Sequence, residues 1–438
     1  MKRFLMLAVA MLFAMTISAQ EYYVSKDTGS NRGDGSKEKP YKNIQKAIDA
    51  VPEGATIYVA EGNYFGTLDI GNINVTKCVK IYGGYNTDFS ERNILKYKTM
   101  VQPNAESNGT AKGQGTMIVT VNNPEGEIVI DGILFDRGNC ISYNVRGEGK
   151  PDGVASAMMN PIGTAGKGGA NLDEANVTTT ETRELHFNNP NCKEITVRNC
   201  AFVNAPNYGV GGQIHCKLVV ENNIFINCRM IACDVWGGDA RENMTVEFKN
   251  NTVLFVWSRL NDFGDMGYGY RYNNGTNSYV DHNIFGCCIF SALDRCRVES
   301  DKSREAKKVA ESTNNLFFLN KRGDVAIPGG GMFKFVNVEE FEDCEQLTEI
   351  DGCKRLKDPK VFNGKINMAY LKGFMGATYT ESTSYDANSA DNQFREAMGM
   401  NKQGTIKSKV TMFANRYPFE EALKLFGAVK EYGAQMPK

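Results

Sequence analysis

The feature that most constrains the fold of this chain is a short motif that recurs along it. In each copy a polar pair is followed by a short apolar run, as in VRNCAFVN, VENNIFIN, FKNNTVLF, VDHNIFGC and STNNLFFL. The anchor residues of these copies are Phe202, Phe225, Val253, Phe285 and Phe317, at intervals of 23, 28, 32 and 32 residues. An earlier copy, VIDGILFDRG, has its anchor at Phe135, 67 residues upstream.

Such a repeat cannot bury its own apolar face, but copies stacked on one another can. The strands of neighbouring copies would then lie about 4.8 Å apart along the stack. Three residues before the anchors stand Gly132, Asn199, Asn222, Asn250, His282 and Asn314. Asn tolerates a left-handed turn, and stacked Asn amides can bond to one another along the stack. Cys228 and Cys288 each follow an anchor by three residues, which predicts small buried fillers. The repeats therefore predict an all-β solenoid.

The stretch before the repeats predicts a cap. Ile44, Ala47, Ile48 and Val51 follow helical spacing, so a short helix there would have one apolar face to close the open end of the stack. The opening YYVSKDTGSNRGDGSKEKPYKNIQKAIDAVPEGATIYVAEGNY, the segment VKIYGGYNTDFSERN and the repeats resemble the right-handed parallel β-helix of the pectin-lyase-like superfamily. That resemblance covers roughly residues 21–335 and implies a β-helix with a short N-terminal capping helix.

The first residues have the pattern of a secretory signal peptide. Lys2 and Arg3 precede an apolar run from Phe4 to Ile17, and small residues follow before Gln20. We expect residues 1–19 to be a signal peptide and the protein to be exported to the periplasm, the cell surface or the medium. No later segment is apolar enough to predict a membrane span. The net charge of -1 predicts no nucleic-acid partner, and we expect a monomer.

Two regions depart from the repeat. The insertion at about 138–185 is rich in Gly, Asn and Thr, and it predicts either a flexible overhang or a lid over a substrate groove. Residues 20–335 are expected to form the β-helix domain, and 336–438 a partly helical C-terminal capping extension. Phe419, Leu423, Phe426 and Val429 have near-helical spacing there. Of the 12 cysteines, Cys344 and Cys353 are the predicted disulfide pair, and most of the others are expected to be buried thiols.

Candidate catalytic and cation-binding residues are found by counting nine residues on from three consecutive anchors, Phe225, Val253 and Phe285. That offset places Asp234, Asp262 and Asp294 in one predicted column. Stacked carboxylates either hold a proton at raised pKa or bind a cation such as Ca²⁺, for which Asp234, Asp262 and Asp265 are the candidate ligands. Further candidates for contact with a glycan are the two Trp and the charged residues nearby: Trp236, Trp257, Asp239, Arg295 and Arg297.

The resemblance implies a polysaccharide substrate and two kinds of chemistry. Lyases of the superfamily break uronic-acid chains by β-elimination, whereas its hydrolases use paired Asp as general acid and base. A lyase-like role would make Arg259 or Arg271 the base, with the three Asp as cation ligands or acids. The alternative is a non-catalytic β-helix that binds glycan or serves in adhesion, with these Asp and Arg as solvated, mutually paired side chains. No compact Asp-Asp pair and no RxPxxR-like stretch is present to favour the lyase.

Overall fold

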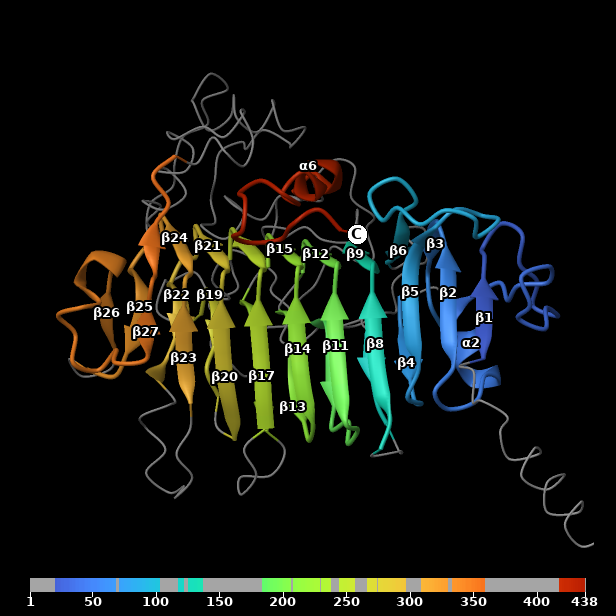
Figure 1. Ribbon diagram of the computed structural model, residues 1–438, viewed down its shortest axis with the longest axis horizontal. Coiled ribbons are helices and arrows are strands. Elements are labelled where there is room, and N and C mark those ends of the chain that lie inside the picture. The colour runs from blue at the N-terminus through green and yellow to red at the C-terminus, as the bar shows by residue number, and fades with distance from the viewer. Residues whose placement is uncertain are drawn as a thin grey trace, which may run out of the picture.

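The computed structural model is a stack of parallel β-coils (Figure 1). It describes residues 20–67, 71–102, 117–121, 125–136, 183–205, 208–228, 230–237, 244–256, 266–273, 275–296, 309–329, 333–358 and 417–437. Each full coil contributes one strand to each of three sheets, which are called sheets A, B and C in the order in which a coil passes through them. Neighbouring strands pair in parallel along the whole stack, except for one antiparallel pair at the end of sheet C. The chain is therefore a parallel β-helix, as the repeats predicted.

Sheet A runs along one face of the molecule (Figure 1). Its order is β1 (Glu21–Val24), β2 (Thr56–Ala60), β5 (Lys80–Tyr85), β8 (Glu127–Asp131), β11 (Glu194–Arg198), β14 (Lys217–Glu221), β17 (Met244–Lys249), β20 (Thr276–Asp281), β23 (Ala310–Thr313) and β27 (Ile350–Asp351).

From β2 onward, each strand of sheet A is followed along the chain, after the polar turn, by a strand of sheet B. Its order is β3 (Gly62–Tyr64), β6 (Thr99–Val101), β9 (Leu134–Asp136), β12 (Ala201–Val203), β15 (Ile224–Ile226), β18 (Thr252–Leu254), β21 (Ile284–Gly286), β24 (Leu316–Phe318) and β28 (Lys354–Arg355). Because β27 and β28 pair in parallel with the coil before them, the stack continues past the predicted boundary at residue 335.

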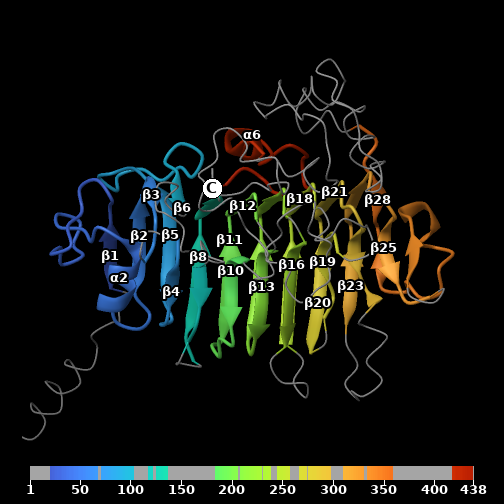
Figure 2. The same ribbon diagram turned by 180° about the vertical axis from the view of Figure 1, so that it is seen from behind.

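Sheet C lies behind sheet A and is seen in Figure 2. Its order is β4 (Ile73–Val75), β7 (Met117–Val119), β10 (Arg183–Asn188), β13 (Tyr208–Ile214), β16 (Ile231–Gly237), β19 (Tyr268–Arg271), β22 (Ser291–Asp294), β25 (Gly323–Ile327) and β26 (Lys334–Val336). Only β26 runs antiparallel to its neighbour, and the 3-10 helix η2 (Val338–Glu340) follows it.

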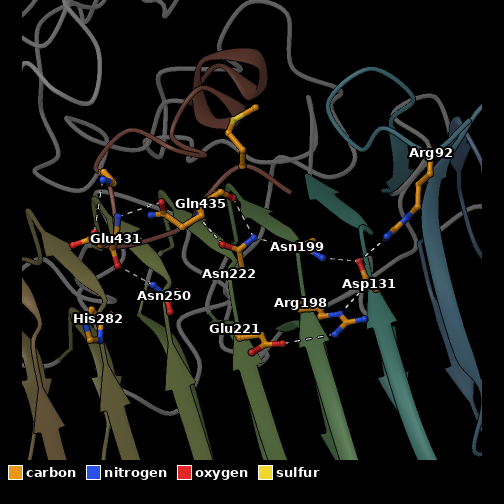
Figure 3. A pocket seen from close by; sticks show the side chains of 12 residues that line it. Arg92, Asp131, Arg198, Asn199, Glu221, Asn222, Asn250, His282, Glu431 and Gln435 are labelled. Carbon is orange, nitrogen blue, oxygen red and sulfur yellow. Dashed lines mark hydrogen bonds and ion pairs between the residues drawn. The ribbon is translucent and has the colours of Figure 1, made fainter. Parts of the chain in front are cut away.

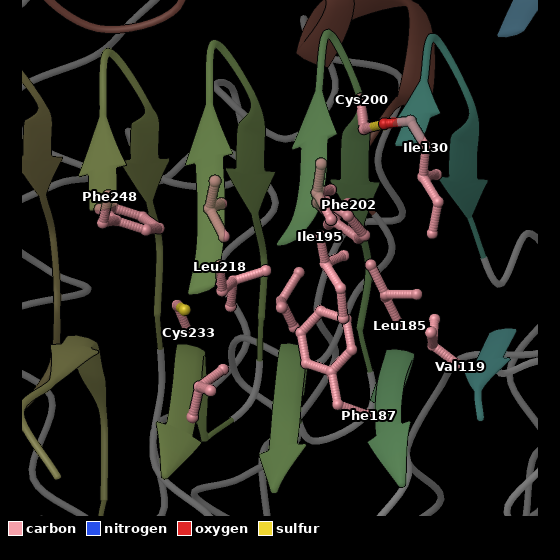
Figure 4. Close-up of a cluster of buried hydrophobic side chains, with 14 of the residues drawn as sticks. Val119, Ile130, Leu185, Phe187, Ile195, Cys200, Phe202, Leu218, Cys233 and Phe248 are labelled. Atoms are coloured by element: carbon pink, nitrogen blue, oxygen red, sulfur yellow. The ribbon is translucent and has the colours of Figure 1, made fainter. Parts of the chain in front are cut away.

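The predicted anchors pair directly with one another in sheet B. Phe135 pairs with Phe202, Phe202 with Phe225, and the series continues through Val253 and Phe285 to Phe317. The rings of Phe135, Phe202 and Phe225 stack with centroids 4.9 and 4.8 Å apart. Where Val253 interrupts the aromatic series, Phe248 from β17 lies between Phe225 and Phe285. Figure 4 shows this interior, with Phe202 and Phe248 packed among aliphatic side chains.

The turn between sheets A and B repeats one backbone conformation. Gly132, Asn199, Asn222, Asn250, His282, Asn314 and Gly352 all have a φ between 51° and 70°. Gly and a few polar residues such as Asn adopt this left-handed backbone conformation at little energetic cost, whereas most other residues avoid it. The stacked amides lie mostly one residue further on: Asn223, Asn251, Asn283 and Asn315 are fully buried, and each of the first three donates to Oδ1 of the next at 2.9–3.1 Å. The predicted ladder is present, and the second member of the polar pair forms most of it, although the turn residue Asn222 also donates to Asn199 at 2.7 Å.

Added structure covers one end of the β-helix and one of its sides. Helix α2 (Ile44–Ala50) buries Ile44, Ala47 and Ile48 against the first coils, which confirms the capping helix. At the other end of the sequence, residues 417–437 pass over sheet B (Figure 1) and pack on its outer apolar side chains. The helix in this segment, α6 (Phe419–Leu423), is short because turns follow it and Gly427 has a φ of 75°.

The cysteines differ from the prediction in one respect. Cys228 and Cys288 are fully buried core fillers, as expected. Cys344 and Cys353 are free thiols, so the predicted disulfide between them is absent. Cys353 instead continues the buried Asn ladder, because Asn315 points its amide nitrogen at the Cys353 sulfur at 4.0 Å.

Candidate functional site

Three consecutive strands of sheet C bring charged side chains into one column. Asp234 at the centre of β16 pairs with Arg271 at the end of β19, and Arg271 pairs with Asp294 at the end of β22. The preceding residue on each strand belongs to the buried core, as Cys233 and Leu293 illustrate. Because side chains alternate along a strand, the three charged residues lie on the outer face of sheet C.

The column is held together by close contacts. Arg271 donates from Nε to Asp294 Oδ2 at 2.7 Å, and its Nη1 lies 3.8 Å from Asp234 Oδ2. Asn273 donates its amide to Asp234, and the backbone N–H of Cys296 donates to Asp294 at 3.0 Å. Asp234, Arg271 and Asp294 are 5%, 6% and 2% exposed, so their charges act on one another through little water.

The charge state of Arg271 follows from these neighbours. Burial lowers the pKa of its guanidinium, but the carboxylates of Asp294 and Asp234 outweigh burial and raise that pKa above its ordinary value. Arg271 is therefore firmly protonated and is a poor proton acceptor. It is suited instead to neutralise carboxylates, whether those of the protein or those of an acidic sugar.

A second arginine lies beside the column, and sequence reasoning missed it. The guanidinium of Arg183 on β10 lies over the rings of Tyr208, at 4.8 Å, and Trp236, at 5.6 Å. Gly211 makes room for it, since a Cβ there would lie 2.9 Å from Arg183 Nε. Counting from anchors could not find Arg183, because the preceding anchor, Phe135, is separated from it by the long insertion.

The structure rearranges the predicted column. Asp262 was expected between Asp234 and Asp294, but Arg271 occupies that place because β19 begins only at Tyr268. Arg295 is also away from the column: it is 3% exposed and paired with Glu349 at 2.8 Å. Trp236 lies two residues after Asp234 on β16, so its side chain is on the same face of sheet C, and it is half-buried. The remaining candidates lie outside the described residues: Arg259, Asp262, Trp257, Arg297, Asp239 and Asp265.

The described residues do not suit the predicted Ca²⁺ site. A cation at Asp234 would face the guanidinium of Arg271, and among the residues that the structure describes no three carboxylate, His or Cys side chains gather as ligands. The Ca²⁺ prediction therefore depends on Asp262 and Asp265, which lie outside the described residues. Within the same part of the chain, no helix has the length and apolarity that a membrane crossing requires.

Comparison with known proteins adds little to this geometry. No protein-family model and no curated protein matches the sequence significantly. Among solved structures, the native GH136 lacto-N-biosidase from Eubacterium ramulus is similar at 11% identity and a TM-score of 0.30, covering 77% of this chain and 67% of that one. A rhamnogalacturonan lyase is similar at 11% identity and a TM-score of 0.25, covering 73% and 84%. These scores are too low to bear on function, and the fold rests on the strand register.

Proposed function

We propose that this chain is an exported protein that acts on carbohydrate along the outer face of sheet C. The observation that carries the proposal is the column of Asp234, Arg271 and Asp294, with Arg183 and Trp236 beside it. Aromatic faces pack on sugar rings, and guanidinium groups bind carboxylates with two parallel hydrogen bonds. An acidic, uronic-acid glycan is therefore the proposed substrate class.

The proposed reaction is β-elimination. A positive group neutralises the sugar carboxylate, a base removes the proton from the adjacent carbon, and the bond to the leaving oxygen breaks as a double bond forms. Arg271 fits the neutralising role and not that of the base, because the two carboxylates keep it protonated. Arg259 remains the base that the sequence predicts, and it lies outside the described residues.

Two alternatives have observations of their own. Asp234 and Asp294 flank Arg271 two strands apart, and a carboxylate pair is what glycoside hydrolysis requires. The low exposure of all three side chains favours the other alternative, a non-catalytic glycan-binding or adhesion protein in which the column only holds three coils together.

One assay separates these functions. The full mature chain is incubated with polygalacturonate, alginate, heparan sulfate and rhamnogalacturonan, with Ca²⁺ or with a chelator. Ultraviolet absorbance of unsaturated sugar ends supports the lyase, and new reducing ends without that absorbance show hydrolysis. Arg271→Met should abolish either activity, whereas Lys424→Met, a change at an exposed side chain, should not. If no polymer is cleaved under any condition, the catalytic proposal is rejected.

Export is tested separately. The charged start and apolar run of residues 1–19 support cleavage before Gln20. N-terminal sequencing of the protein recovered from cell fractions should find Gln20 first, outside the cytoplasm. An intact Met1 on mature, folded protein would contradict export.

A further inference from the structure

A polar groove lies away from the sheet C column. It encloses about 840 Å³ between the ends of the sheet A strands and the C-terminal segment, residues 430–436 (Figure 3). Another cavity among the described residues, near helix α2, holds about 260 Å³. None of the residues that form the sheet C column lines either space. The groove is therefore a separate place where a ligand could bind.

The floor of the groove carries charges that cancel one another. Asp131, Arg198 and Glu221 line the groove at the same register on three consecutive strands of sheet A, and Arg92 pairs with Asp131. Lys249 continues this register on the next strand but does not line the groove. Arg198 donates to Asp131 at 2.6 Å, and Glu221 lies 3.8 Å from Arg198 and 3.4 Å from Lys249. Because each charge has an opposite neighbour, the floor has no net attraction for a polyanion or a polycation.

Paired charges of this kind suit hydroxyl groups. A carboxylate accepts a hydrogen bond from one hydroxyl, and the adjacent guanidinium donates to the next. Arg198 and Glu221 keep side-chain exposures of 39% and 28%, so both can reach a ligand. The pattern repeats with the spacing of the coils, about 4.8 Å. An extended chain of hydroxyl-bearing units lying across the strands would meet the same groups in turn.

The rim adds one polar side chain for each coil. The left-handed turn residues Asn199, Asn222, Asn250 and His282 line the groove. His282 Nδ1 lies 2.7 Å from the carboxylate of Asp281, which also accepts from Thr313 and Asn314. Since an ionised carboxylate can only accept, His282 donates from Nδ1 to Asp281, and its Nε2 is left to bond a ligand hydroxyl.

The opposite wall is fixed in place. The backbone N–H and carbonyl of Gln435 both bond to the side chain of Asn222, at 2.6 and 3.1 Å. The amide of Asn250 donates to the carbonyl of Glu431 at 3.1 Å. Met436, 58% exposed, offers an apolar surface beside these contacts. A groove whose walls are already bonded loses little further conformational freedom when a ligand enters.

We propose that this groove binds a neutral oligosaccharide lying across the coils, with Glu221 and His282 as direct hydrogen-bonding partners. The site is independent of the proposed activity on sheet C. It would hold a glycan chain at a fixed place on the β-helix while the other face remains free.

The test is titration calorimetry of the full mature chain with cellohexaose, xylohexaose and mannohexaose, and with hexagalacturonate as the acidic probe. At least one neutral hexaose should bind saturably and more tightly than hexagalacturonate. Glu221→Gln and His282→Asn should each weaken that binding about tenfold, the loss of one hydrogen bond. Glu247→Gln is the matched control: Glu247 is equally exposed, pairs with Lys217 and Lys249, and lies outside the groove.

Three outcomes would overturn the proposal. No neutral hexaose binds, or Glu247→Gln weakens binding as much as Glu221→Gln, or Asp234→Asn on sheet C removes binding while the unfolding midpoint is unchanged. The last outcome would place the sugar on sheet C. Failure to cleave any uronic-acid polymer would reject the proposed catalysis and would leave the groove proposal standing.

Discussion

At the scale of single residues, the polar pair of each repeat divides two tasks between neighbours. The first member takes the left-handed turn, as Asn250 does with a φ of 51°. The second member is buried and bonds along the stack. The Oδ1 of Asn251 accepts from the N–H of Asn223 at 3.0 Å, and its amide donates to Asn283 and to the carbonyl of Val220. The two asparagines should therefore respond differently to substitution.

Asn251→Ala should cost about 3 kcal/mol of unfolding free energy, because it leaves several buried polar groups of neighbouring coils without partners. Asn250→Gly is the matched substitution one residue away, since glycine accepts the left-handed turn and Asn250 lies at the surface. It should cost less than about 1 kcal/mol. Urea unfolding of both variants measures the difference. Equal losses would show that the buried ladder contributes no more than the turn.

Lys321 should make the stability of the folded chain depend on pH in the alkaline range. Burial, with a smaller contribution from Arg322, lowers the pKa of this lysine from 10.5 to about 8. Between those values the unfolded chain holds a proton that the folded chain has released, so stability should rise as pH rises from about 8 to 10.5. Lys321→Met should remove that part of the rise. Thermal unfolding across this range tests it, and parallel curves for the two proteins would contradict the assignment.

At the scale of elements, the C-terminal segment seals the outer face of sheet B. Tyr417, Leu423, Leu425 and Phe426 pack on side chains such as Ile224 and Ile284. The backbone of Tyr417 exchanges two hydrogen bonds with the side chain of Asn204 on the turn after β12. The C-terminal segment, more than 200 residues from Asn204 in sequence, thereby covers the apolar outer face of sheet B over several coils.

Phe426 tests that contribution. It is 4% exposed, and Phe426→Ala should cost about 3–5 kcal/mol through the cavity it leaves. Lys424→Ala, two residues earlier and 59% exposed at its side chain, should change stability by less than about 0.5 kcal/mol. Chemical unfolding with binding of a hydrophobic dye reports both stability and opening of the segment. A neutral Phe426→Ala would mean that the segment adds no stability.

The charged column on sheet C couples three strands. Arg271→Met leaves Asp234 and Asp294 buried without their shared cation and should cost about 3–5 kcal/mol. Adding Asp234→Asn and Asp294→Asn should recover part of that loss, because no uncompensated charge remains. Unfolding free energies of the single and triple variants measure the coupling. If the triple variant is no more stable than the single one, packing and not charge explains the loss.

At the scale of the whole molecule, stability depends on neighbours in the stack. Strands β11, β14 and β17 are paired on both sides, whereas β27, with two residues, ends sheet A. In a solenoid each coil is stabilised by the coils above and below it. Amide hydrogen exchange should therefore be at least about tenfold slower in β11, β14 and β17 than in β27. Uniform protection along the stack would indicate a single cooperative unit instead.

The chain by itself determined the β-helix, its anchors and its capping helix, because the motif repeats whenever a coil closes and the buried anchors must then face one another. Asp234 and Asp294 could be placed in one column for the same reason. The sequence could not show that Arg271 separates them, that Arg183 lies beside them, or that residues 430–436 form a groove with Asn222 and Asn250. Those placements depend on how much chain each loop uses between strands, and on contacts between segments hundreds of residues apart. Only the tertiary structure decides these placements, because neither the loop lengths nor the long-range contacts follow a period that can be counted along the chain.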